Sequence, residues 1–243
     1  MRTAFTYILL IFVFATGAFA QSPLDQVWQT ITKSRNTPAN LSNDKITAGL
    51  KEALKVSTGK AVASTGRPDG FLKNEAIKIL LPEKMRTAAK GMRLLGMGPQ
   101  LDQLEVGMNR AAEQATPLAK QIFLNAVYKM TIDDARGILT GGDNAATDYF
   151  RRQSSADLTT AFKPIVHDAM QRVGVIQQYN QVMKNPVASQ LLKSQGFNFD
   201  DYVVGKTLDG LFYTLGQEEK QIRRDPAART TQLLRDVFGN LQQ

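Results

Sequence analysis

Residues 130–152 read MTIDDARGILTGGDNAATDYFRR. This order predicts a short helix, a diglycine turn and a second helix that ends in aromatic and arginine residues. Thr131 belongs to the residue types that cap helix N-termini, and two aspartates follow it in the first turn, where the helix dipole favours acidic groups. Gly141-Gly142 ends this first helix, and Asp143 is predicted to cap the next one. The stretch therefore indicates packed helices and points to no particular reaction.

The same helical period extends over most of the chain. Apolar residues recur at spacings of three and four across residues 100–130, which predicts an amphipathic helix. Pro117 interrupts this pattern, and we expect a kink or short break near Ala115-Thr116 because a mid-helix proline removes a hydrogen bond. No strand pair with hairpin chemistry and no internal repeat appears. The sequence therefore predicts an all-α fold, a single globular domain of about eight to ten helices.

Start and stop signals place the remaining elements. The segment Ile77–Leu80 is ambiguous, because a residue that precedes a proline such as Pro82 avoids the helical region, yet no partner strand is predicted. Pro164 is expected near the start of a long helix. The helical domain should span residues 41–241, after a short helix and linker over residues 21–40. Helices are expected at about residues 22–35, 42–66, 82–95, 143–150, 158–183, 186–195, 200–225 and 226–238.

The first twenty residues have the pattern of a secretory signal peptide. Arg2 provides the positive charge, Tyr7–Phe14 the apolar run, and Ala18-Phe19-Ala20 the small-x-small cleavage site. The apolar run is shorter than the ~20 residues that span a bilayer. We therefore expect cleavage after Ala20 and a periplasmic or secreted protein. An uncleaved N-terminal helix is the alternative.

The chain contains no cysteine and carries a formal net charge of +8. The missing cysteines exclude thiol nucleophiles, thiolate metal sites and a lipid anchor on an N-terminal cysteine. The basic residues are dispersed, with short clusters only at Arg151-Arg152 and Arg223-Arg224. No nucleic-acid partner is expected from such a distribution. The charge indicates solubility first and, as an alternative, a weak attraction to anionic envelope surfaces.

The side chains that usually carry catalysis or metals are few. His167 is the single histidine, and its apolar helical surroundings favour a packed or surface role over catalysis. The acidic residues Asp133, Asp134 and Asp143 do not follow the order of an EF-hand loop, and helix capping explains them more simply. No cofactor and no metal site is predicted.

Two pairs of polar residues stand one helical turn apart, Asn109 with Glu113 and Glu219 with Arg223. They form either solvated helix faces or a buried polar network that includes Asp209 and Arg229. If a pocket exists, aromatic residues of the C-terminal half would line it. The diglycine turn ahead of a helix N-terminus is a possible anion cradle, although it is more often a tight turn. The candidate ligand-binding residues are Asn109, Arg110, Glu113, Asp209, Phe212 and Arg223, and the candidate anion-binding residues are Gly141, Gly142 and Asp143.

The order of these motifs resembles the bacterial family called domain of unknown function 4197. The resemblance covers about residues 41–239 and implies an exported helical domain. Several members resemble lipid-anchored envelope proteins, and this chain departs from them because it lacks the lipidated cysteine. The family has no assigned activity, so the resemblance implies no catalytic residues. It is carried by residues 41–54, 69–71, 77–82, 108–113, 130–151, 208–212 and 219–239.

These observations favour a non-enzymatic binding or interaction protein of the cell envelope. Its partner would be an envelope protein or an apolar small molecule. One alternative is a periplasmic hydrolase that uses carboxylates, Glu113 with Asp209 or Glu219. Another alternative is a structural subunit of an envelope assembly.

The signal-peptide interpretation predicts the N-terminus of the exported protein. When the full chain is expressed in a bacterium with a secretion system, the protein recovered from the envelope fraction should begin at Gln21, because cleavage follows Ala20. Intact-mass measurement and N-terminal sequencing check this. A recovered protein that still begins at Met1 would contradict it.

Overall fold

The computed structural model describes residues 43–94, 96–172 and 198–225, with the single residues 174, 177, 184, 186 and 189. These residues belong to a compact unit that runs from Leu41 to Gln243. The signal peptide, the helix expected at 22–35 and the helix expected at 226–238 lie outside the described residues, as does most of the helix expected at 186–195.

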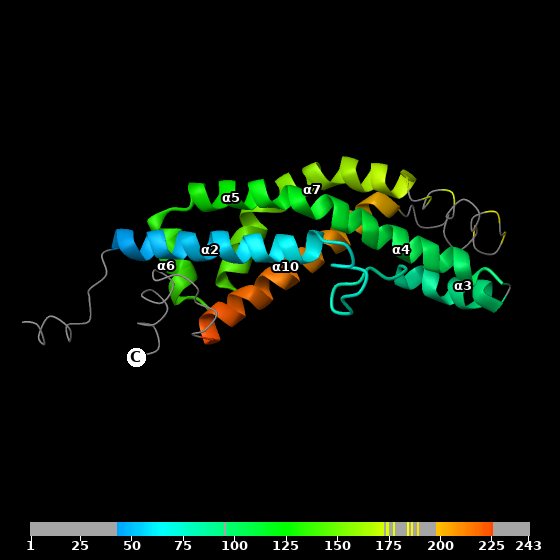
Figure 1. The fold of residues 1–243 in the computed structure, drawn as a ribbon, viewed down its shortest axis with the longest axis horizontal. Helices are drawn as coiled ribbons and strands as arrows, with labels where there is room; N and C mark the ends of the chain where they lie inside the picture. Colours follow the sequence, from blue (N-terminus) through cyan, green and yellow to red (C-terminus); the bar gives the residue numbers. More distant parts are fainter. Residues whose placement is uncertain are drawn as a thin grey trace, which may run out of the picture. The chain divides into compact units, whose positions relative to one another are not determined.

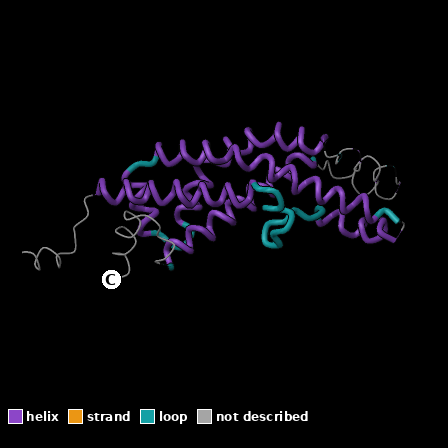
Figure 2. Tube along the Cα trace, viewed as in Figure 1, coloured by secondary structure: helices purple, strands orange, loops and turns teal. Residues whose placement is uncertain are grey.

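The described segments are helices joined by turns and loops, with no strand among them, so the all-α prediction is confirmed for this part of the chain (Figures 1 and 2). The described part does not settle the expected number of eight to ten helices. No helix in these ranges is both long and apolar enough to cross a membrane. The elements are α2 (Asn43–Gly66), α3 (Glu83–Leu94), α4 (Gly98–Ala115), the 3-10 turn η1 (Thr116–Leu118), α5 (Ala119–Lys129), α6 (Ile132–Thr140), α7 (Ala145–Arg172) and α10 (Phe199–Arg224).

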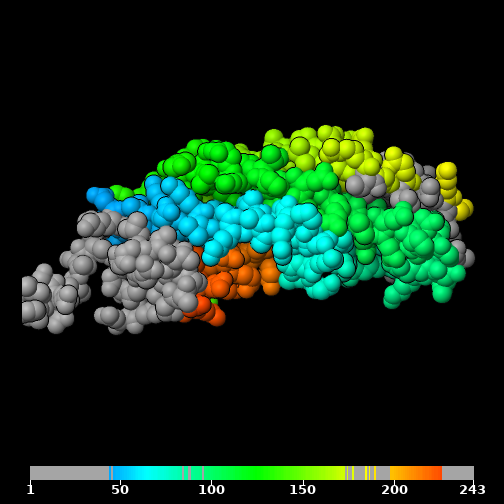
Figure 3. Space-filling view, in the orientation of Figure 1, coloured from blue at the N-terminus to red at the C-terminus, as the bar shows by residue number. Residues whose placement is uncertain are grey.

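The core lies where α7 packs against α4 and α10, and where α2 packs against α5 and α10. Figure 3 shows α2 and α10 side by side on one face. Three buried aromatic rings join the helices. The centroid of Phe123 in α5 lies 5.1 Å from that of Phe150 in α7 and 6.0 Å from that of Phe212 in α10. Each aromatic side chain of this kind buries roughly 150–250 Å², so the cluster is a large share of the hydrophobic stabilisation.

The break predicted near Pro117 is confirmed. The helix pattern over residues 100–130 divides into α4 and α5 at the turn η1. The Thr116 hydroxyl donates to the carbonyl of Ala112 at 2.8 Å, which occupies one of the last carbonyls of α4. A Cβ on Gly66, the last residue of α2, would lie only 3.1 Å from the Pro117 ring. The break therefore coincides with close packing of the end of α2.

Two predictions about α7 are wrong. Residues 143–150 and 158–183 were expected as separate helices, but α7 is one continuous helix from Ala145 to Arg172, and Pro164 lies inside it. Residues 151–157, which lie between the two expected helices, are polar except for Ala156. In the structure most of residues 151–157 are exposed on the outer side of α7, and the opposite side of the helix remains buried. That buried side continues through Phe150, Ser154, Leu158 and Phe162 at spacings of four.

Two helix starts are fixed by side-chain caps. Thr131 and Asp134 form a reciprocal capping box at the start of α6, in which the Asp134 amide donates to Thr131 Oγ1 at 3.1 Å and the Thr131 amide donates to Asp134 Oδ2 at 3.0 Å. This confirms the predicted start. Helix α10 begins slightly before the expected Asp200 or Asp201, because Asn198 accepts from both of their amides at 2.9 and 3.2 Å.

The buried row of α7 contains a polar atom that makes no hydrogen bond. Ser154 Oγ is buried without a partner in the described part of the chain. An unsatisfied buried hydroxyl costs about 1–3 kcal/mol, so Ser154→Ala should leave the free energy of unfolding unchanged or raise it. At this size each kcal/mol corresponds to about 2–4 °C in melting temperature. Thermal unfolding followed by circular dichroism measures this.

The neighbouring, partly exposed Ser155, whose hydroxyl donates to the Arg151 carbonyl at 2.6 Å, provides the matched control variant Ser155→Ala. A melting temperature for Ser154→Ala well below that of this control would mean that the Ser154 hydroxyl has a partner.

Candidate functional site

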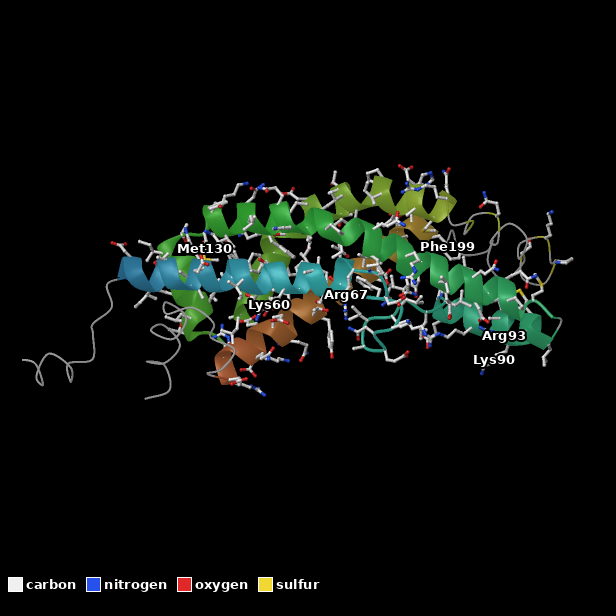
Figure 4. The ribbon with its side chains drawn as sticks, viewed as in Figure 1. Lys60, Arg67, Lys90, Arg93, Met130 and Phe199 are labelled. Atoms are coloured by element: carbon white, nitrogen blue, oxygen red, sulfur yellow. The ribbon has the colours of Figure 1, made fainter. Side chains whose placement is uncertain are left out.

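The connection between α2 and α3 is the longest non-helical stretch among the described residues, and we call residues 67–82 the α2–α3 loop. Figure 2 shows it as the folded teal segment beside the helices, and Figure 4 labels Arg67, where it begins. The loop exceeds the ~12–15 residues beyond which an irregular connection in a compact domain is usually functional or disordered. The contacts below show that this loop is held in place at many points.

Glu113 of α4 holds the first part of the loop. Its Oε1 accepts hydrogen bonds from the amides of Phe71 and Leu72, both at 3.1 Å. The carboxylate is only 5 % exposed, and Arg110 donates to its other oxygen at 2.7 Å. A buried charge of this kind is stable only when it is paired and hydrogen-bonded, and here it has both kinds of partner.

Arg110 extends the network to the loop surface. Its second guanidinium nitrogen donates to Asp69 at 2.7 Å, and Lys73 pairs with the same carboxylate at 2.8 Å. Hydrogen bonds from Lys73 and then Arg110 lower the pKa of Asp69 below its ordinary value of 3.8. A lowered carboxyl pKa means that this contribution to stability is complete above pH 3.8 and is lost as the pH falls through the lower folded pKa.

Asn109 holds the second part of the loop. Its side-chain amide donates to the carbonyl of Ile79 and accepts from the amide of Ile79, both at 2.8 Å. One turn earlier, Glu105 accepts from the amide of Leu81 at 3.0 Å. The ambiguous segment Ile77–Leu80 is therefore neither helix nor strand. Its Ile79 backbone pairs with the side chain of Asn109, and the amides of Ile77 and Lys78 donate to the carbonyl of Asn74.

Two glycines allow the loop to approach its neighbours closely. A Cβ on Gly70 would lie 2.5 Å from the carbonyl oxygens of Ser64 and Thr65 in α2. A Cβ on Gly210 in α10 would lie 2.6 Å from the buried ring of Phe71. The Tyr202 hydroxyl, whose pKa is raised by burial, donates to the carbonyl of Leu80 at 2.8 Å. Residues from α2, α4 and α10 thus contact the loop, which fixes its conformation.

The outer side of the loop is polar and lies between two open hollows. One hollow, of about 520 Å³, is lined by the loop from Arg67 to Glu75 and by the end of α2. The other, of about 260 Å³, lies between the loop residues 76–78 and α10. Asp209 lines this second hollow, and its carboxylate lies 3.4 Å from Lys206 Nζ. Both hollows are surface features with charged groups of both signs.

Glu219 is the centre of a second buried network, at the N-terminus of α7. Its carboxylate accepts from the amides of Ala146 and Thr147 at 2.9 and 2.8 Å, and from the Thr147 hydroxyl at 2.8 Å. Arg223 donates to it at 2.8 and 3.0 Å and also to the carbonyl of Ile138 at 2.7 Å. The helix dipole favours an anion at this place, and the anion is a carboxylate of the same chain.

This network changes the interpretation of the diglycine turn. Asp143, expected to cap α7, instead pairs with Arg224, while Glu219 accepts from the first-turn amides. A Cβ on Gly141 would lie 2.6 Å from both the Ala145 Cβ and the Gly137 carbonyl, so the turn needs glycine for packing. Beside the candidate anion-binding residues Gly141, Gly142 and Asp143, the first-turn amides of Ala146 and Thr147 are already bound to Glu219.

A small apolar cavity lies beside Glu219 and Arg223, with Leu50, Leu54 and Ile222 among its walls. Its volume of about 20 Å³ holds roughly one water molecule. Pockets for drug-sized ligands have about 300–1,000 Å³. A groove of about 450 Å³ between α6 and α7 is lined by aspartates and Arg152, but no group of three metal-binding side chains occurs among the described residues.

His167 contacts residues of two helices, α7 and α10. One ring nitrogen lies 2.7 Å from an oxygen of Asp200 at the start of α10, and the other lies 2.6 Å from the amide nitrogen of Gln171. The side chain is half exposed. It therefore connects α7 with the N-terminus of α10.

Residues 40–239 match the family described as "Protein of unknown function (DUF4197)". The chain belongs to the DUF4197 family. The match confirms the resemblance predicted from the motifs, and the DUF4197 region contains every described helix. No curated protein and no solved structure matches the chain. Because the family description includes no activity, the function of this DUF4197 domain has to be argued from the geometry above.

The structure brings together four of the six candidate ligand-binding residues. Asn109, Arg110 and Glu113 hold the α2–α3 loop, and Asp209 lines the hollow beside it. Phe212 instead lies in the aromatic core, where Arg151 stacks over its ring at 4.6 Å. Arg223 belongs to the network at the start of α7.

The sequence interpretation missed two residues of the loop network, Glu105 and Asp69. Glu105 stands one turn before Asn109, so the four-residue spacing that joins Asn109 and Glu113 also reaches it. Asp69 has a positive φ of 65°, a conformation in which Asn and Asp are enriched. The spacing at Glu105 and the turn-forming order Gly66-Arg67-Pro68-Asp69-Gly70 are both visible in the sequence.

The loop network predicts the effect of removing its central carboxylate. Glu113→Ala leaves the amides of Phe71 and Leu72 and the partly buried Arg110 without their acceptor, so it should lower the free energy of unfolding by about 3 kcal/mol. Hydrogen exchange at the amides of Phe71 and Leu72 should accelerate more than exchange in α7. The matched control is Gln114→Ala, which removes an exposed side chain of the same helix.

Unfolding by denaturant, together with hydrogen exchange read by NMR, measures both effects. Equal stability losses in the two variants, or unchanged exchange at both loop amides in Glu113→Ala, would contradict a holding role for this carboxylate.

Proposed function

We propose that this protein is a non-enzymatic, exported binding protein of the cell envelope that presents the α2–α3 loop to a protein partner. The observation that supports this most directly is the use of buried polar groups. Glu113 and Asn109 both direct their hydrogen bonds to the loop backbone. Loops that a rigid scaffold positions in this way are the usual carriers of binding residues.

The hollows support a protein partner over an apolar small molecule. The apolar cavity holds about one water molecule, whereas the hollows beside the loop are open, larger and lined by charged groups. A polar and open surface of this kind is typical of the rim of a protein–protein interface. The favoured partner is therefore an envelope protein.

The hydrogen bonds of the carboxylates support binding over hydrolysis. The two oxygens of Glu113 accept from the loop and from Arg110, and those of Glu219 accept from the start of α7 and from Arg223. A general acid or base needs a proton-transfer path to a substrate, and these oxygens already have structural donors. Asp209 lies at the surface beside Lys206.

Export is part of the proposal and is supported by the N-terminal sequence, with its apolar run and small-x-small site. Cleavage after Ala20 would release a protein that carries no lipidated cysteine. A structural subunit of an envelope assembly would use the same loop to contact its neighbours, so the experiment below tests both variants of a binding role.

A photo-crosslinking amino acid at Glu75 tests the loop in living cells. The Glu75 side chain is 84 % exposed on the outer side of the loop. We expect a discrete adduct with one envelope protein, identifiable by mass spectrometry, because the fixed loop forms part of the interface. The matched control position is Gln153 on the exposed side of α7, which should give no such adduct.

The Glu113→Ala substitution, combined with the crosslinker at Glu75, should weaken the adduct because the loop loses its fixed conformation. If the positions Glu75 and Gln153 give the same products, or if no adduct forms at Glu75, the loop is not the binding surface.

A further inference from the structure

The outward face of η1 and α5 has an arrangement that the loop does not explain. Four uncharged residues follow one another at spacings of three, four and three, so they lie along one side of a helix with 3.6 residues per turn. Two of them are large and exposed, Leu118 at 42 % and Tyr128 at 63 %. The two between them are bound to each other, since Gln121 donates to Asn125 at 3.0 Å. We call these residues the α5 strip: Leu118, Gln121, Asn125 and Tyr128.

The charged residues of η1 and α5 have one sign. At 3.6 residues per turn, the exposed Lys120 and Lys129 lie toward the two borders of the exposed side of the helix. Residues 116–129 contain no aspartate and no glutamate. Lys55 of the neighbouring helix α2 adds a third cation, with its Nζ 5.2 Å from the centroid of the Tyr128 ring.

After the strip, the next acidic groups along the chain are at the start of α6. Asp133 lies 3.5 Å from Arg136, and Asp134 is bound in the capping box with Thr131. Ile132 precedes them and is 44 % exposed. The acidic charge at this end is therefore engaged with local partners, while Lys120 and Lys129 have no acidic residue on their own helix.

We propose that the α5 strip is a contact surface for an anionic lipid bilayer. Tyrosine and aliphatic side chains partition to the boundary between headgroups and acyl chains, and lysines at the borders of such a strip extend to the phosphates. Anionic lipids attract each lysine near the surface, and this attraction falls with salt. The formal net charge of +8 acts in the same direction at longer range.

Two features select a bilayer over other occupants. The strip has only two large apolar residues, which is little for the core of a stable protein interface but sufficient for shallow and reversible insertion. Its cations are isolated lysines at the borders, where a lipid surface offers phosphates on all sides. The contact uses other elements than the α2–α3 loop, so it stands or falls independently of the loop's function.

Vesicle co-sedimentation tests the contact. The protein used is residues 21–243, which keeps the whole compact unit from Leu41 onward and omits the apolar N-terminal run. Vesicles of phosphatidylcholine mixed with phosphatidylglycerol are compared with vesicles of phosphatidylcholine alone. We expect binding to the mixed vesicles that weakens with added salt, and no binding to the uncharged ones.

Matched variants locate the surface. The double variant Lys120→Gln, Lys129→Gln should lower the partition coefficient about 30-fold, from the attraction of two lysines near an anionic surface. The single variant Tyr128→Ser should also lower the partition coefficient, and at every salt concentration, because it removes the inserted ring. The charge-matched control is Lys60→Gln, Lys90→Gln, whose lysines lie on α2 and α3 as Figure 4 shows. Lys60 lies within 4.0 Å of Glu218 on α10.

The control variant should lose only the part of the binding that comes from net charge. An equal loss in both double variants, binding to both kinds of vesicle, or no binding at all would overturn the proposal. A concentration-dependent dimer that Tyr128→Ser abolishes would overturn it as well, because a second copy would then cover the strip. Circular dichroism of each variant confirms that the compared proteins are folded.

Discussion

The structure depends on one arrangement that occurs twice: a buried glutamate that accepts hydrogen bonds from two consecutive backbone amides and from an arginine of its own helix. Glu113 binds the amides at residues 71 and 72, and Glu219 binds those at residues 146 and 147. Burying a carboxylate costs several kcal/mol, and charge-assisted hydrogen bonds offset this cost only when every partner is in place. A shift of α4 or α10 by one turn would leave a charge and two amides unpaired. Each glutamate therefore fixes where its own helix packs against the segment whose amides it binds.

The two networks differ in the kind of backbone that the glutamate binds. At Glu219 the bound amides belong to the first turn of a helix, where the dipole already favours an anion, so this network secures the packing of α10 on α7. At Glu113 the amides belong to an irregular loop, whose own backbone hydrogen bonds are those of turns. The same chemistry thus stabilises the fold in one place and shapes a surface in the other.

Local features of the sequence predicted most of the helices and some of the site. The capping box at Thr131 and the break at Pro117 were predictable because their signals lie within a few residues of the structures that they form. The polar spacing of Asn109 and Glu113 was visible as well. Their partners were not, because the bound amides lie up to 42 positions away and a backbone amide leaves no mark on residue type. Helix α7 was divided wrongly because Ser154, a polar residue in the buried row, interrupted the apolar pattern.

In the proposed binding role, the fixed conformation of the loop would affect the affinity for a partner as well as the shape of the surface. Ordering one residue of a mobile loop costs roughly 1–2 kcal/mol, and a partner that had to order this loop would lose that free energy from its affinity. Here Glu113, Asn109 and Glu105 order the backbone during folding, before any partner arrives. Such preorganisation lets a modest polar surface bind with useful affinity, since fewer degrees of freedom are lost in the complex. The buried polar groups of α4 are therefore best understood through the loop that they hold. An apolar helix face would leave four loop amides without their acceptors, those of Phe71, Leu72, Ile79 and Leu81.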